Sequence, residues 1–100
     1  MSRAPVRIHP AALEEAEAVI EWYRRRSTRA AEMFVDELDR AIERIGHHPG
    51  QSPEYAFRTR RMVLQRFPYL VVFREVAVGV EIVAVAHGRR RPGCWRDRVG

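Results

Sequence analysis

The sequence predicts a single α+β domain over residues 1–100: an N-terminal β-strand, an antiparallel two-helix hairpin, and a three-stranded antiparallel sheet packed on the helices. Three observations predict this fold class. Apolar and polar residues alternate near the N-terminus, two amphipathic helical stretches follow with only a short connection, and three β-type runs occupy the second half. A chain of 100 residues suits one core of modest size.

The first strand and the first helix are separated by a proline. Residues 5–9 alternate apolar and polar side chains, which predicts a short strand that Pro10 breaks. From residue 11 to residue 26, good helix formers carry an apolar stripe at spacings of three and four. Glutamates gather near the start of this helix and arginines at its end, as the helix dipole favours. The predicted stripe consists of Leu13, Ala16, Ile20 and Tyr23.

A second helix is predicted from a cap at Ser27 or Thr28 to about Ile45, with Gly46 as its C-terminal stop. The short connection predicts an antiparallel helical hairpin. Neither apolar stripe can be buried by the other helix alone, so both need a further apolar surface. The stripe of the second helix consists of Phe34, Leu38, Ala41, Ile42 and Ile45.

Three β-type runs supply that surface, at residues 60–64, 69–74 and 80–86, with Gly79 in the turn between the last two. The middle run is apolar on both faces, which suits a central strand. The helical hairpin would cover one of these faces, and another element or a partner would cover the other.

The basic residues are unevenly distributed and are all arginine. The first half of the chain has 8 Arg against 9 acidic residues, and the second half has 10 against 4, which gives the net charge of +5. The absence of lysine is also what codon bias in a GC-rich genome would produce, so the position of the arginines is the more informative feature. Residues 87–100 gather a histidine, five arginines and a tryptophan, which points to an acidic partner.

Several classes of protein are excluded or disfavoured. Cys94 is the only cysteine, so it forms no intrachain disulfide and no cysteine-ligated zinc site. The adjacent His47 and His48 lack the spacing of a metal site, and we expect neither metal nor cofactor. The sequence has no apolar run long enough for a signal peptide or a membrane span, which predicts a cytoplasmic protein.

Short motifs occur in the same order as these elements. They are Glu21-Trp22-Tyr23, Ala31-Glu32-Met33-Phe34, Pro49, Arg60-Arg61, Arg66-Phe67-Pro68-Tyr69, Ala86-His87-Gly88-Arg89-Arg90, Trp95 and Arg98. With the order of strand, helical hairpin and antiparallel sheet, they resemble the RelE/ParE superfamily of bacterial toxins, in its ParE-like branch. The resemblance covers nearly the whole chain.

The resemblance implies the toxin of a type II toxin-antitoxin system, held inactive in a hetero-oligomer by a cognate antitoxin. ParE-like members are associated with inhibition of DNA gyrase, and RelE-like members with messenger-RNA cleavage on the ribosome. Gyrase inhibition is our leading hypothesis. The alternatives are a ribosome-dependent endoribonuclease and an inactive antitoxin-binding module.

Ribonuclease chemistry would need a proton acceptor, a proton donor and positive charge beside the reacting phosphate. The candidates are His87, Tyr69, Arg61 and Arg90. His87 could equally be an imidazole at a strand end that bonds to backbone or to a carboxylate. The chain has no lysine, so the lysine-plus-arginine set of some RelE-like ribonucleases cannot be carried over.

A larger set of residues is predicted to contact a partner or nucleic acid, because it clusters in sequence and in the predicted sheet. Trp95 in this set could instead pack the C-terminal tail onto the sheet or helices. The pair Trp22-Tyr23 is predicted to form an aromatic edge of the core, with a protein interface as the alternative. The predicted contact set is Arg60, Arg61, Arg66, Arg89, Arg90, Arg91, Trp95 and Arg98.

Overall fold

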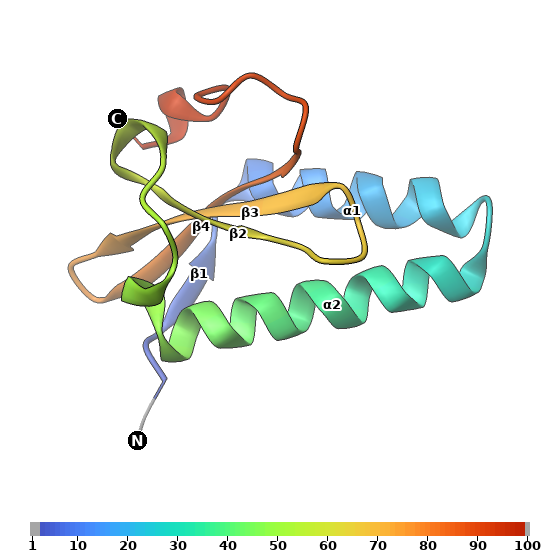
Figure 1. The fold of residues 1–100 in the computed structure, drawn as a ribbon, viewed down its shortest axis with the longest axis horizontal. Helices are drawn as coiled ribbons and strands as arrows, with labels where there is room; N and C mark the ends of the chain where they lie inside the picture. The colour runs from blue at the N-terminus through green and yellow to red at the C-terminus, as the bar shows by residue number, and fades with distance from the viewer. Residues whose placement is uncertain (1–2, 100) are drawn as a thin grey trace.

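The computed structural model describes residues 3–99 and confirms the predicted α+β fold (Figure 1). A strand and two long helices come first, and three strands follow. Short 3₁₀ helices lie in the connection before β2 and at the C-terminus. In chain order the elements are β1 (Val6–Ile8), α1 (Pro10–Arg24), α2 (Thr28–His47), η1 (Pro49–Gln51), η2 (Ala56–Arg58), β2 (Arg60–Val63), β3 (Tyr69–Val76), β4 (Gly79–His87) and η3 (Arg96–Arg98).

The sheet has four strands in the order β1-β4-β3-β2, one more than the three-stranded sheet predicted. Strands β2, β3 and β4 pair antiparallel as expected, and β1 adds to the free edge of β4 in parallel, with Val6 opposite Val80. A parallel neighbour requires a long crossover, and the helical hairpin provides part of it. The alternation in residues 5–9 predicted the strand but not its partner.

The turn between β3 and β4 requires a glycine for two reasons. Gly79 has a φ of 99°, a conformation that side chains other than glycine rarely adopt. A Cβ at this position would also lie 2.1 Å from the carbonyl oxygen of Pro5, which accepts a hydrogen bond from the amide of Val80. The predicted turn is therefore confirmed, and it is also the point where the N-terminal segment joins the sheet.

Helix α1 begins one residue earlier and ends two residues earlier than predicted. Pro10 occupies its first turn, where a missing N–H costs nothing, and the Nδ1 atom of His9 accepts a hydrogen bond from the amide of Ala11 (3.0 Å). The helix buries Ala12, Ala16 and Val19. The prediction that Leu13 belongs to the buried stripe is wrong: its side chain is 47% exposed, because small alanines form the contact with the sheet.

Helix α2 follows the prediction closely at its start and along its apolar face. The Ser27 hydroxyl accepts a hydrogen bond from the amide of Ala30, and Phe34, Leu38, Ala41 and Ile45 are buried. The C-terminal stop is not at Gly46, because the helix continues through this residue to His47. A Cβ at Gly46 would lie 2.8 Å from the Arg3 side chain, so this glycine makes room for the N-terminal segment.

The two faces of the sheet are covered by different parts of the chain. The helical hairpin packs on the face that contains Val71 and Phe73. The opposite face, with Val72, is covered by the C-terminal segment, where Trp95 is 1% exposed and stacks on Tyr55. Figure 1 shows this segment, in red, on the side of the strands away from α2. The chain itself, rather than a partner, therefore covers the second face of the central strand.

Candidate functional site

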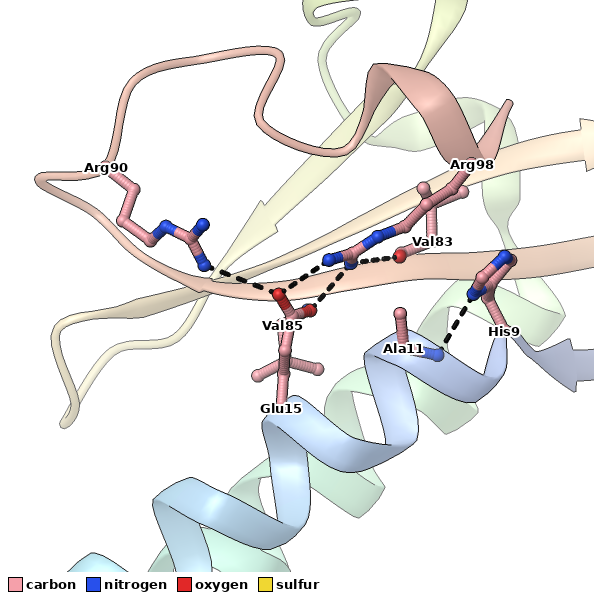
Figure 2. Close-up of polar contacts among 7 residues, drawn as sticks. All are labelled: His9, Ala11, Glu15, Val83, Val85, Arg90 and Arg98. Carbon is pink, nitrogen blue, oxygen red and sulfur yellow. Dashed lines mark hydrogen bonds and ion pairs between the residues drawn. The ribbon is translucent and has the colours of Figure 1, made fainter. Parts of the chain in front are cut away.

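The basic C-terminal end is organised around one glutamate of α1. Figure 2 shows Glu15 reaching the edge of β4, where its Oε1 accepts hydrogen bonds from the amide of Val85 (3.1 Å) and from Arg98 Nη1 (2.9 Å). Its Oε2 accepts from Arg98 Nη2 (3.0 Å) and from Arg90 (3.4 Å). The same Nη1 of Arg98 also donates to the carbonyl oxygen of Val83 (3.0 Å). We call Glu15, Arg90 and Arg98 the Glu15 cluster.

The cluster occupies a place that a longer β1 would fill. Strand β1 pairs with β4 only as far as Ile82, so the carbonyl of Val83 and the amide of Val85 have no strand neighbour on that edge. A buried backbone group without a partner is costly, and the side chains of Glu15 and Arg98 satisfy these two. The hydrogen bonds that Arg98 donates to Glu15 also raise the pKa of Arg98 above its ordinary value.

His87 and Tyr69 are brought together, at the end of the β3–β4 pair. They are register partners, and their rings meet edge to face with centroids 5.3 Å apart. The Tyr69 ring also packs against Phe34. Burial raises the pKa of Tyr23, with a further contribution from Tyr69, because these phenols lie in one aromatic cluster beneath the sheet.

The hydrogen bond of His87 determines which ring nitrogen can accept a proton. The Nδ1 atom accepts a hydrogen bond from the backbone amide of Arg89 (3.0 Å), so it carries no proton in this arrangement. The neutral ring then carries its proton on Nε2. In this tautomer Nε2 is a donor, so His87 is not arranged as a general base.

The arginines proposed for catalysis do not converge on this pair. Arg90 is turned toward Glu15. Arg61 lies opposite Val72, three residues along β3 from Tyr69 and thus about 10 Å away. Its guanidinium lies over the ring of Tyr55, 4.7 Å from the centroid.

The predicted contact set divides into internal and exposed side chains. Trp95 is buried in the core, as its packing alternative predicts, and Arg98 belongs to the Glu15 cluster. Arg60 donates to the carbonyl oxygen of Ser52 (2.7 Å). Apart from Arg61 and Arg90, described above, the other three arginines of the set are exposed and make no ion pair within residues 3–99. They are Arg66, Arg89 and Arg91.

A groove between α2 and the edge strand β2 was not predicted from the sequence. It consists of two adjoining hollows that share Arg44, Met62 and Val63. Val63 is 60% exposed, and arginines contribute to the lining at both ends. A weak signal was the spacing of Arg40 and Arg44, which places both on one face of α2, although such a pair is also typical of a solvated helix. We call this the α2–β2 groove.

Comparison with known proteins identifies the family. The sequence matches the family described as "ParE toxin of type II toxin-antitoxin system, parDE" over residues 6–92. The chain belongs to the ParE toxin family. This ParE-family chain is similar in fold to a solved structure titled "Chromosomal ParDE TA system from P. aeruginosa", with a TM-score of 0.75 and 15% sequence identity, covering 85% of this chain and 96% of that chain. A comparison with curated proteins gives no match.

Two further properties of the ParE-family chain concern what it can bind. Among residues 3–99, no group of three or more histidine, cysteine, aspartate or glutamate side chains could hold a metal ion. No helix within the same residues has the length and apolar character needed to cross a bilayer. The features that remain for binding are the arginines and exposed apolar residues described above.

We expect Glu15→Gln to lower the free energy of unfolding by about 2 kcal/mol, because it leaves the largely buried Arg98 without a counter-charge. Glu43→Gln is the matched control: Glu43 pairs with Arg3 and His47 at the exposed surface, where such a loss costs less than about 0.5 kcal/mol. Urea unfolding followed by circular dichroism measures both. Equal stability of the two variants would contradict the assigned role of the Glu15 cluster.

Proposed function

We propose that the chain is neutralised in the cytoplasm by a cognate antitoxin and that, when free, it inhibits DNA gyrase by protein contact without chemistry of its own. Membership of the ParE family supports the toxin and antitoxin parts of this proposal. The observation that supports inhibition without chemistry is the hydrogen bond from the Arg89 amide to His87 Nδ1, which leaves Nε2 of the neutral ring as a donor and not as a proton acceptor.

RNA cleavage would require that acceptor beside a phosphate. The 2′-hydroxyl must lose its proton as it attacks, and an arginine cannot take it because its pKa exceeds about 12. Two of the arginines that would stabilise the phosphorane, Arg61 and Arg90, are instead engaged by Tyr55 and Glu15. The set therefore lacks both a base and a converging cationic clamp.

A ribosome-dependent endoribonuclease is the second candidate. The edge-to-face contact of His87 with Tyr69 supports it, together with the exposed Arg89 and Arg91 nearby in the chain. In that case the ribosome and the messenger RNA would be the partners, and the loop after His87 would have to release Nδ1 on binding.

We propose the α2–β2 groove as the antitoxin-binding surface. β2 is an edge strand, and an edge can accept a further strand through unpaired backbone groups. The start of β2 already bonds to residues 53–54, where the Arg61 amide donates to the Pro53 carbonyl oxygen, so the accessible part of this edge is at Val63. Arg40, Arg44 and Arg61 line the groove, and no carboxylate within residues 3–99 forms an ion pair with any of them. Asp36 and Glu37 also line it, and Glu37 is engaged by backbone amides of the β2–β3 connection. An acidic, amphipathic segment of the antitoxin would satisfy these arginines and cover the exposed Val63.

We predict that His87→Ala remains toxic, with growth inhibition and arrest of DNA replication within about twofold of wild type. A general acid or base contributes about 10²–10⁴-fold to a rate, so a catalytic histidine would show a much larger effect. Expression without antitoxin, with replication and transcript integrity followed together, measures this. Rapid transcript cleavage that the variant loses would establish the ribonuclease instead.

We expect the double variant Arg40→Glu/Arg44→Glu to bind the antitoxin at least ~10-fold more weakly, since it reverses the charge along the groove. Arg96→Glu is the matched control, because Arg96 is exposed on the C-terminal segment, away from the residues that line the groove. Titration calorimetry with the protein encoded beside the toxin gives both affinities. Equal losses in the double variant and the control would contradict the assignment of the groove.

A further inference from the structure

The tip of the helical hairpin exposes a large aromatic side chain. Trp22 is 49% exposed, so the prediction that it forms an edge of the core is wrong. Its neighbour Tyr23 occupies that place and stacks on Phe34 with centroids 5.8 Å apart. Burying the exposed part of an indole is among the largest gains that a single side chain offers to a protein interface.

Trp22 is held in place before any partner binds. The guanidinium carbon of Arg26 lies 3.7 Å from the centroid of the Trp22 ring. Nη1 of Arg26 donates a hydrogen bond to the carbonyl oxygen of Trp22 (2.8 Å). The ring of Tyr23 meets the indole at 88°, with centroids 5.0 Å apart. A side chain that is already ordered loses little conformational entropy on binding. Arg26 also covers one face of the indole, which favours a protein pocket over base stacking.

One charge at the tip, that of Arg29, opposes helix stability. Arg24 and Arg25 share Glu21 and lie at the C-terminal end of α1, where the helix dipole favours cations. Arg29, in contrast, lies in the first turn of α2, which contains no acidic residue. A cation at the positive end of a helix dipole is unfavourable, so the fold does not explain Arg29. Neither Arg26 nor Arg29 forms an ion pair with a carboxylate of the described residues.

The tip is separate from the groove but close to it. Figure 1 shows the connection between α1 and α2 well beyond the end of the sheet. The α2–β2 groove begins at Met33, four residues and thus about 6 Å along the helix from Arg29. A segment seated in the groove would therefore lie beside anything large that docks on the tip.

We infer that the hairpin tip, formed by Trp22, Arg26 and Arg29, is the docking surface for the protein target, on which it fits an acidic face with an apolar recess for the indole. This inference rests on the proposed function. The positive charge of the hairpin tip is complementary to such a face, and the aromatic and arginine side chains of the tip are those that dominate protein interfaces. Antitoxin in the neighbouring groove would then neutralise the toxin by excluding the target.

The test compares Trp22→Ala and Arg29→Glu with the control Val78→Ala, which alters an exposed apolar residue at the far β3–β4 turn. Binding of each full-length variant to purified gyrase, to the antitoxin and to duplex DNA is measured by surface plasmon resonance. We expect both tip variants to bind gyrase at least ~10-fold more weakly. Their affinity for antitoxin and their thermal unfolding, like the gyrase affinity of Val78→Ala, should remain close to wild type.

Each other result overturns a defined part of the inference. Tip variants that bind gyrase as tightly as wild type would refute the docking surface and leave the proposed function intact. A wild-type protein that binds no gyrase would refute the proposed function and the inference with it. Parallel losses toward gyrase and antitoxin would show that the tip is not specific for the target, and weakened binding to duplex DNA alone would assign it to nucleic acid.

Discussion

The structure depends on the short length of β1. Three residues of this strand pair with β4, and beyond them the edge is completed by side chains of the Glu15 cluster. Because Arg98 is part of this edge, the C-terminal segment is fixed across the sheet, and Trp95 is placed on its second face. One hydrogen-bonding requirement of the backbone thus links α1, the sheet and the C-terminus.

This arrangement gives several arginines in the second half of the chain a structural role. Several of its arginines satisfy carbonyl or carboxylate groups inside the molecule, and Arg74 does so twice, with Glu81 and with the carbonyl of Val99. The positive charge is therefore not one continuous patch for nucleic acid. Arginines without an ion pair in residues 3–99 also occur in the first half, where the charge count conceals them. They are Arg26 and Arg29 at the hairpin tip and Arg40 and Arg44 on α2.

Sequence periodicity predicted the local structure of each segment. The apolar stripe of α2, its Ser27 cap and the antiparallel pairing of the last three strands follow from local patterns and are confirmed. Contacts between distant segments could not be predicted in this way. The two tryptophans show this: the sequence predicted Trp22 at an aromatic edge of the core, with a protein interface as the alternative, and left Trp95 between packing and recognition. The structure exposes the first and buries the second. Nothing in the local sequence indicates that Glu15 meets Arg98.

We propose that this toxin acts by binding and not by chemistry, and a stoichiometric titration tests this proposal most directly. Purified gyrase would be titrated with the toxin while supercoiling is followed, and antitoxin would then be added. We expect loss of supercoiling near one toxin per gyrase binding site, independent of incubation time, with recovery when antitoxin is added. Progressive, time-dependent inactivation by far less than one toxin per gyrase would contradict it.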